Sequence, residues 1–314
     1  MSASTPFAPQ DRADADDDVG APAPAPRPPA DEDAADREVV VGVDGSECAL
    51  GAVRWAAHEA ALRGAPLRIV HAAPYLGRRG SPAAPSPELP RARSITGQAF
   101  TAARHAEHGL AVTTEVVPGE PIATLLQAAA GGQLLVLGSS TTGAADEMVL
   151  ASVNLRVAAR SVHPVVAVPR QRGTAAGGRP VVAILGIGGA GDDAAVAEFA
   201  ADAAERLGTR LSVLQTGAAG RGAASWADDP DQWRERYPDL EVTHTALHGA
   251  SAGEVLSASA PAPLLVMSTG HGTLLHRSLD GPHRWLLRHC TSPIALVPEV
   301  GRDQRPREEI AAPG

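Results

Sequence analysis

The chain has 314 residues, of which 44% are hydrophobic and 3% aromatic, and at about 150 residues per domain this length predicts two domains. Lysine is absent, which excludes a P-loop and Schiff-base chemistry. The two cysteines, Cys48 and Cys290, are far apart in sequence, which argues against a disulfide framework and against a cysteine-rich zinc site.

The net charge of −9 is concentrated near the start, because residues 1–37 hold nine acidic residues and three arginines. The Ala, Pro and Asp composition of this segment predicts a disordered tail. The sequence has no basic footprint for nucleic acid, no apolar core of a secretory signal, and no apolar run near the ~20 residues that span a bilayer. We therefore expect a cytoplasmic protein that binds neither nucleic acid nor a membrane.

Between residues 38 and 168, strand-like segments alternate with segments of helical spacing. The predicted strands are Glu38–Asp44, Leu67–His71, Ala111–Val117, Gln133–Gly138 and Pro164–Val168. The predicted helices between them are 47–63, 95–108, Pro121–Ala130 and Asp146–Arg160. This alternation predicts a parallel sheet that is covered by helices on both faces.

The pattern then occurs a second time. A shift of 144 residues aligns Gly42 with Gly186, and further on a shift of 130 aligns Leu134–Val136 with Leu264–Val266. Near the end the shift is 129. A repeat of this length indicates duplication of a whole domain. We therefore predict a tail, a first copy, a linker, a second copy and a second tail at residues 1–37, 38–169, 170–179, 180–298 and 299–314.

One candidate site residue is Asp44, which follows the first predicted strand. In an open parallel sheet, ligands bind outside the carboxyl ends of the strands, where the strand order reverses. A carboxylate at that place can accept hydrogen bonds from an adenine amino group or a ribose hydroxyl. The alternative is that Asp44 and Ser46 only form a turn and cap the following helix.

A second candidate segment begins where the fourth strand ends on Gly138 and a loop of small residues follows. Backbone N–H groups in such loops, and at helix starts, can hold phosphate oxygens. Gly138 would allow close backbone approach, and Ser139 and Ser152 would offer hydroxyl groups. The alternative is an ordinary loop between a strand and a helix.

Residues Gly249–Gly253 match the G-x-S-x-G pattern of a serine hydrolase. However, Ser251 and Glu254 also have the S-x-x-E spacing of a capping box at a helix start. The repeat favours capping, because the equivalent Gly119–Pro121 also opens a predicted helix. We find no base–nucleophile pair for a hydrolase and assign no catalytic residue.

Two histidine pairs, His105 with His108 and His244 with His248, have the spacing of metal ligands. Zinc usually needs three or four convergent ligands, and no thiol lies near the second pair. We interpret these histidines as solvated or hydrogen-bonded and predict no metal site.

With both copies aligned, the sequence resembles the universal stress protein family in its tandem two-domain form. The opening segment 39–56 and the closing segment His163–Val168 carry this resemblance in the first copy, and Arg288–Val297 carries it in the second. The resemblance implies an α/β fold of two Rossmann-like domains, of the adenine nucleotide alpha hydrolase-like type. Each would have a five-stranded parallel sheet of order 3-2-1-4-5 with helices on both faces.

The resemblance also implies how the copies associate, because family members often pair through the last strand of each domain. In a tandem chain the two copies can make this contact internally, as a pseudo-dimer. The pairing edges would be Val165–Val168 and Ile294–Val297. A homodimer of whole chains is a further expectation.

In ATP-binding members of the family, an Asp and the backbone after the second strand contact the adenosine, and a glycine-rich motif holds ribose and phosphates. The resemblance implies an ATP or AMP site, with Mg²⁺, at Asp44, Ala72, Gly138, Ser139, Thr141, Ala151, Ser152 and Val153. Thr141 and Ala151 replace two glycines of the family motif, and a Cβ at such positions obstructs close backbone approach.

The second copy departs further from the family motif. Gly188 stands where the first copy has its acid, and Ser268 and His271 replace the first two glycines. Gly281 aligns with the third glycine, and Pro282 then takes the place of the hydroxyl residue. We therefore expect a stress-response protein that binds at most one nucleotide, in the first copy. The alternatives are a nucleotide-free interaction protein of two structural domains and, least favoured, a hydrolase.

Overall fold

The computed structural model describes residues 38–76, 88–139, 153–170, 178–187, 193–216, 233, 235–247, 249–259, 261–269 and 281–298. The predictions for the two tails, and for most of the linker, fall outside these residues. The same holds for Thr141, Ala151 and Ser152 of the candidate site.

In its described residues, the first copy contains five strands and three long helices. The strands are β1 (Glu38–Gly42), β2 (Leu67–Ala72), β3 (Val112–Val117), β4 (Gly132–Ser139) and β5 (Val165–Pro169). The helices are α2 (Glu47–Arg63), α3 (Glu88–Ala106) and α4 (Pro121–Ala130), and residues 153–158 are also helical. The predicted strands and the helices 47–63 and Pro121–Ala130 are confirmed, with strand ends shifted by one or two residues, whereas residues 146–152 of the predicted helix Asp146–Arg160 lie outside the described residues.

The largest difference from the sequence prediction is in α3, which begins at Glu88 rather than at residue 95 and ends at Ala106 rather than at 108. Its buried side chains are Ala92, Thr96, Ala99 and Ala103, which are spaced by three or four residues along one helical face. Pro90 lies in the first turn, where its missing N–H has no partner within the helix and is therefore tolerated.

The second copy repeats these elements. Its strands are β6 (Val181–Leu185), β7 (Leu211–Gln215), β8 (Val242–Ala246), β9 (Leu265–Ser268) and β10 (Ile294–Val297). Its helices are α6 (Ala194–Arg206), α9 (Ala252–Ser259) and α10 (Gly281–His289).

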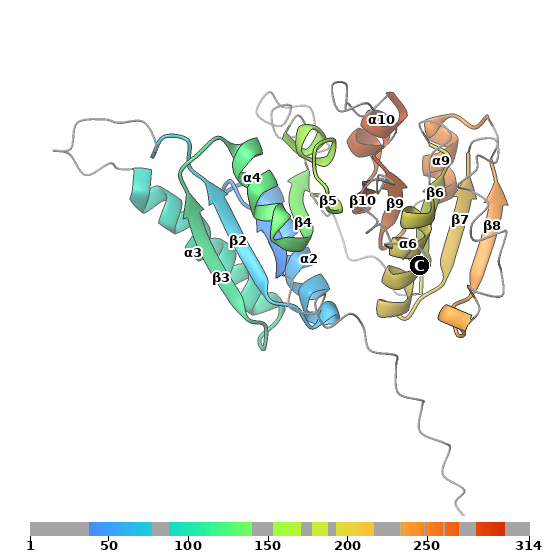
Figure 1. The fold of residues 1–314 in the computed structure, drawn as a ribbon, viewed down its shortest axis with the longest axis horizontal. Helices are drawn as coiled ribbons and strands as arrows, with labels where there is room; N and C mark the ends of the chain where they lie inside the picture. The colour runs from blue at the N-terminus through green and yellow to red at the C-terminus, as the bar shows by residue number, and fades with distance from the viewer. Residues whose placement is uncertain are drawn as a thin grey trace, which may run out of the picture.

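All ten strands belong to one sheet with the order β3-β2-β1-β4-β5-β10-β9-β6-β7-β8 (Figure 1). Within each copy the strands are parallel and follow the predicted order 3-2-1-4-5. The copies meet at β5 and β10, which pair antiparallel, with Val166 opposite Ala295. The same register places Ala167 opposite Ile294 and Val165 opposite Leu296.

Helices cover both faces of this sheet (Figure 1). The core on one face contains side chains of α2, α3 and α6, and the core on the other face contains side chains of α4, α9 and α10. Each core includes residues of both copies. β5 and β10 are buried along their whole length, so the junction of the copies lies inside the protein. Such fully apolar strands are typical of parallel sheets with two covered faces.

Candidate functional site

The candidate site lies at the carboxyl ends of β1, β2 and β4. β1 lies between β2 and β4, with Gly42 opposite both Val70 and Leu137. α2 follows β1 on one face of the sheet, whereas the helical residues 153–158, which come after β4, pack on the other face. The helices reached from these two strand ends therefore lie on opposite faces, which is the arrangement at which ligands bind in open α/β sheets.

Asp44 lies at this point, two residues beyond the end of β1, and its side chain is exposed. Its Oδ1 accepts a hydrogen bond from the backbone N–H of Ser46 at 2.9 Å. The Ser46 hydroxyl in turn accepts from the N–H of Ala49 at 3.1 Å and caps α2. The turn-and-cap interpretation thus describes bonds that are present, while the exposed carboxylate remains accessible to a ligand.

The turn after Asp44 requires a glycine. Gly45 has a φ of 89°, and a Cβ at this position would lie 3.0 Å from Cγ1 of Ile95 on α3. A larger residue would therefore be strained in its backbone and would press on α3. This turn directs the chain from β1 into α2 and fixes the position of Asp44.

Gly138 marks a close approach of two backbones at the end of β4. A Cβ at this position would lie 2.6 Å from the carbonyl carbon of Cys48 and 2.7 Å from the nitrogen of Ala49. Both atoms belong to the first turn of α2. The space beside Gly138 is therefore taken by helix α2, and the adjacent Ser139 is buried.

Two buried side chains that the sequence reasoning missed hold the backbone around this site. His71 lies 2.8 Å from the carbonyl oxygen of Val43 through Nδ1 and 3.1 Å from the Tyr75 hydroxyl through Nε2. Because a carbonyl only accepts, Nδ1 carries the proton of this bond. Asn154 donates from Nδ2 to the carbonyl oxygen of Gly138 at 2.8 Å.

These bonds tie together the segments that carry the predicted residues. His71 joins the ends of β1 and β2, next to Asp44 and Ala72, and Asn154 joins the helical residues 153–158 to the end of β4. Val153 lies at the start of those helical residues and packs against the core. Among the described residues, the structure therefore gathers Asp44, Ala72, Gly138 and Ser139 at neighbouring strand ends.

The second copy has a different arrangement at the same strand ends. Asp193, which directly precedes α6, is buried, and its Oδ2 accepts from the N–H of Gly186 at 2.8 Å. Gly188 and His271 lie outside the described residues. At the end of β9, the fully buried His283 donates from Nε2 to the carbonyl oxygen of Ser268 at 2.9 Å.

The last bond has the same place in the repeat as one in the first copy. A shift of 129 residues aligns Asn154 with His283, and a shift of 130 aligns Gly138 with Ser268. Each copy thus has a buried side chain that donates to a carbonyl near the end of its fourth strand. Gly281 and Pro282, which align with the phosphate motif, are the first two residues of α10.

The predicted capping box of the second copy is confirmed. Glu254 Oε2 accepts from the N–H of Ser251 at 2.7 Å and from the Ser251 hydroxyl at 2.8 Å. The Ser251 Oγ lies 3.4 Å from the N–H of Glu254. These bonds assign the G-x-S-x-G segment to the start of α9.

Of the two histidine pairs with ligand-like spacing, His248 lies outside the described residues, and among the described residues no three His, Cys, Asp or Glu side chains converge. His105 and His108 are exposed, and His244 lies 3.1 Å from Oε1 of Gln215 through its Nε2. Of the helices that the structure describes, none combines the length and the apolar character needed to cross a bilayer.

Comparisons with known proteins agree with this fold. Residues 37–169 match the model of the Universal stress protein family. A universal stress protein of Mycobacterium tuberculosis is 27% identical over 284 residues, which covers 82% of this chain and 96% of that relative. A universal stress protein from Archaeoglobus fulgidus has a TM-score of 0.67 at 15% identity, over 85% of this chain and 98% of its own.

A further solved structure, of a universal stress protein in complex with cAMP, is 28% identical over 43% of this chain and 98% of its own, with a TM-score of 0.35. The family model and the curated relatives lead to one assignment: residues 37–169 match the universal stress protein family, and the chain is similar to universal stress proteins over both copies.

Proposed function

We propose that this protein is a non-enzymatic, cytoplasmic stress-response protein that binds one adenine nucleotide, ATP or AMP, in its first copy. The observation that carries the proposal is the exposed carboxylate of Asp44 at the point where the strand order reverses. Exposed carboxylates at such strand ends are suited to accept hydrogen bonds from ribose hydroxyls or an adenine amino group.

Different residues of the site contact different parts of the nucleotide. Asp44 binds the nucleoside, and the backbone of Ala72 borders it. Ser139, Thr141, Ala151, Ser152 and Val153 supply the loop and helix start toward the phosphates, and Mg²⁺ accompanies the phosphates of ATP. Gly138 contributes by letting α2 approach β4, since no space for a further group remains beside it.

His71 and Asn154 support the proposal as positioning residues. Each holds a backbone carbonyl that is within one residue of a proposed contact, namely Val43 beside Asp44 and Gly138 itself. A binding site gains affinity when its groups are held before the ligand arrives, because less ordering accompanies binding. In the second copy the buried Asp193 binds its own backbone instead, so we expect no nucleotide there.

The second part of the proposal is that residues 38–169 and 180–298 are two domains that form an internal pseudo-dimer. The register of β5 and β10 supports this. A shift of 129 relates Val166 to Ala295, and these two residues lie opposite each other. A pseudo-twofold axis between them would exchange the other two pairs of that register. The domains are joined by the linker 170–179, and a homodimer of chains would use other surfaces.

A second candidate function is a nucleotide-free interaction protein. The specific observation that favours it is that Ser46 already occupies one oxygen of Asp44, and α2 already occupies the space beside Gly138. These strand ends are thus stable without a ligand.

Isothermal titration calorimetry with ATP and AMP, with and without Mg²⁺, decides between the two. We expect one nucleotide per chain, and a tenfold to hundredfold loss of affinity in Asp44→Asn, from the loss of about 1.5–3 kcal/mol for a hydrogen bond to a charged group. Glu198→Gln, an exposed acid on α6, is the matched control and should bind normally. Absence of heat with both nucleotides would favour the nucleotide-free protein.

A further inference from the structure

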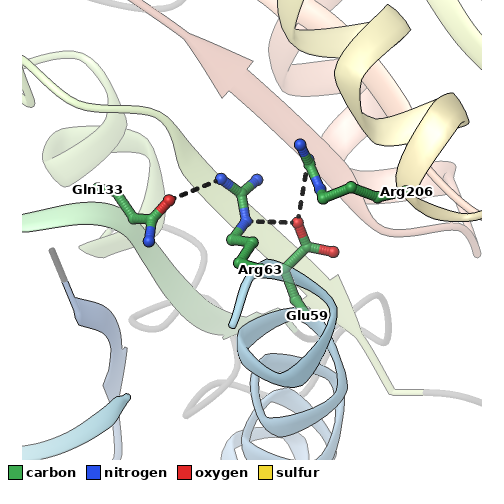
Figure 2. Close-up of polar contacts among 4 residues, drawn as sticks. All are labelled: Glu59, Arg63, Gln133 and Arg206. Atoms are coloured by element: carbon green, nitrogen blue, oxygen red, sulfur yellow. Dashed lines mark hydrogen bonds and ion pairs between the residues drawn. The ribbon is translucent and has the colours of Figure 1, made fainter. Parts of the chain in front are cut away.

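A cluster of four polar side chains lies where the two copies meet (Figure 2). Glu59 and Arg63 come from α2, Gln133 from β4, and Arg206 from α6 of the second copy. Glu59 Oε1 accepts from Arg63 Nε at 2.7 Å and lies 3.3 Å from Arg206 Nη2. Arg63 Nη1 donates to Gln133 Oε1 at 3.0 Å. One carboxylate therefore bridges two guanidinium groups, one from each copy.

The cluster is largely withdrawn from solvent. The exposed fraction is 6% for the side chain of Glu59, 12% for Arg63 and 20% for Arg206. Burial lowers the pKa of Arg63, and the charge of Glu59 counteracts this effect. Arg63 Nη2 and Arg206 Nε are buried without a hydrogen-bond partner. A buried ion cluster of this kind contributes little to stability compared with well-packed apolar side chains, because its desolvation is costly.

The repeat shows that this contact exists on one side of the interface only. A shift of 144 residues relates Glu59 to Ala203, Arg63 to Leu207, and Arg206 to Leu62. The axis that relates the copies would therefore place an ionic contact on one side and the apolar pair Ala203 and Leu62 on the other. The two copies have become different at the place where they touch.

Because of this asymmetry, the charges match when a first copy pairs with a second copy, and they do not match when two identical copies pair. If two second copies paired in the same way, Arg206 would face Ala203 and would lose its carboxylate. If two first copies paired, Glu59 would face Leu62 and would lose one of its two arginines. Each like pairing is therefore penalised, because a buried charge loses a partner that burial makes necessary.

We propose that the Glu59–Arg63–Gln133–Arg206 cluster selects the pairing of the first copy with the second and excludes pairing of like copies from separate chains. This inference rests on the proposed internal pseudo-dimer. The cluster acts as a specificity determinant of the interface, which is an attested role of buried polar groups that do not add stability.

The test uses the full chain with cysteines introduced at Val166 and Ala295, which lie opposite each other across the junction. A disulfide within one chain reports internal pairing on a non-reducing gel, and a disulfide between chains reports pairing in trans. We expect the reference chain to form the internal disulfide. If it does not, the internal pseudo-dimer itself is wrong, whatever the role of the cluster.

Charge reversal in this background tests the selection. Arg206→Glu should lower the internal disulfide several-fold, because two carboxylates then face each other, and Glu59→Arg should do the same with three arginines. The double variant E59R/R206E should restore it. The control is Glu198→Arg on the exposed surface of α6, which creates a like-charge pair with Arg236. This variant should leave the yield of internal disulfide unchanged.

Co-expression of the two single variants gives the sharpest result. In a heterodimer of the two variants, the first copy of each chain can pair with the second copy of the other chain. One interface then has the natural pair of Glu59 and Arg206, and the other has the reversed pair, so opposite charges meet in both. We expect disulfides between the two different chains and very few between identical chains. Equal internal disulfide yields in all variants, or failure of the double variant to recover, would overturn the proposal.

Discussion

The two copies have the same strand order but use an acidic residue differently at the end of their first strand. In the first copy Asp44 is exposed and lies in the turn after β1. In the second copy the acid is Asp193, which is buried and binds the backbone N–H at the end of β6. One copy therefore presents a carboxylate to solvent, and the other uses a carboxylate inside its own fold.

The helices that follow these strands explain why Gly138 and Ser268 differ. α2 begins at Glu47, whereas α6 begins at Ala194, which the shift of 144 aligns with Leu50. Asp193, which this shift aligns with Ala49, is not helical, so the nitrogen that presses on Gly138 belongs to a helix in the first copy only. Ser268 is a buried side chain, whereas no room for a side chain remains at position 138.

The largest expected effect follows from making the first copy like the second at this position. Gly138→Ser would place a Cβ 2.6 Å from the backbone of Cys48, and neither α2 nor β4 can move without disturbing the core. We expect a loss of about 1–3 kcal/mol or more in the free energy of unfolding, measured with urea.

The control for that prediction is Gly97→Ser on α3, where a new side chain meets open space. A Gly138→Ser protein as stable as this control would show that α2 and β4 are less closely packed than the distances imply. The reverse change, Ser268→Gly, should have a much smaller effect.

The next prediction compares how Asp193 and Asp44 contribute to the free energy of unfolding. Asp193→Ala leaves the partly buried N–H of Gly186 without this acceptor, so we expect a loss of about 1–3 kcal/mol in unfolding free energy. Nucleotide affinity should stay unchanged, because the proposed site lies in the other copy. A loss of affinity with Asp193→Ala would instead place a ligand in the second copy.

Asp44→Ala should have the opposite profile. Its hydrogen bond to Ser46 is exposed, so the expected loss is at most about 0.5–1 kcal/mol of unfolding free energy, although nucleotide binding is lost. Denaturation and calorimetry on the same two variants complete the comparison. If both acids affected stability equally, the contrast between an exposed and a structural carboxylate would not hold.

Most of the fold could be predicted from the sequence because it follows from local patterns. Apolar runs and helical spacing located the strands and helices, and the repeat supplied the second copy. α3 was predicted too short because Pro90 and the preceding prolines resemble a break, while its buried face is made of small residues such as Ala92 and Ala99. Alanines give a weak signal of hydrophobic spacing.

The site was predicted less completely, for a physical reason. Asp44 could be found because it directly follows an apolar strand. His71, Asn154 and Asp193 were missed because their partners are backbone groups 28, 16 and 7 residues away, which only the topology brings close. The repeat held one usable signal, since Asn154 and His283 are polar residues at equivalent positions before an apolar stretch.

The smallest effect concerns the helix that precedes the fourth strand in each copy. α4 begins with Pro121 and has no side-chain cap, whereas Ser251 and Glu254 form a capping box on α9. The backbone hydrogen bond from Ser251, and then the one from its hydroxyl, lower the pKa of Glu254 from its usual 4.5. Glu254 therefore stabilises the fold above the unfolded pKa, and this contribution is lost as the pH falls through the folded pKa.

Glu254→Ala should thus lower the melting temperature slightly at pH 7, and the difference from the natural protein should shrink as the pH falls below about 4.5, the ordinary value for a glutamate. Thr124→Ala, at the equivalent position of α4, removes no ionised group and should show no such trend with pH. Melting curves of the three proteins across this range are the measurement. A difference for Glu254→Ala that stays constant into acid would mean that the helix start depends on the shape of the side chain and not on its charge.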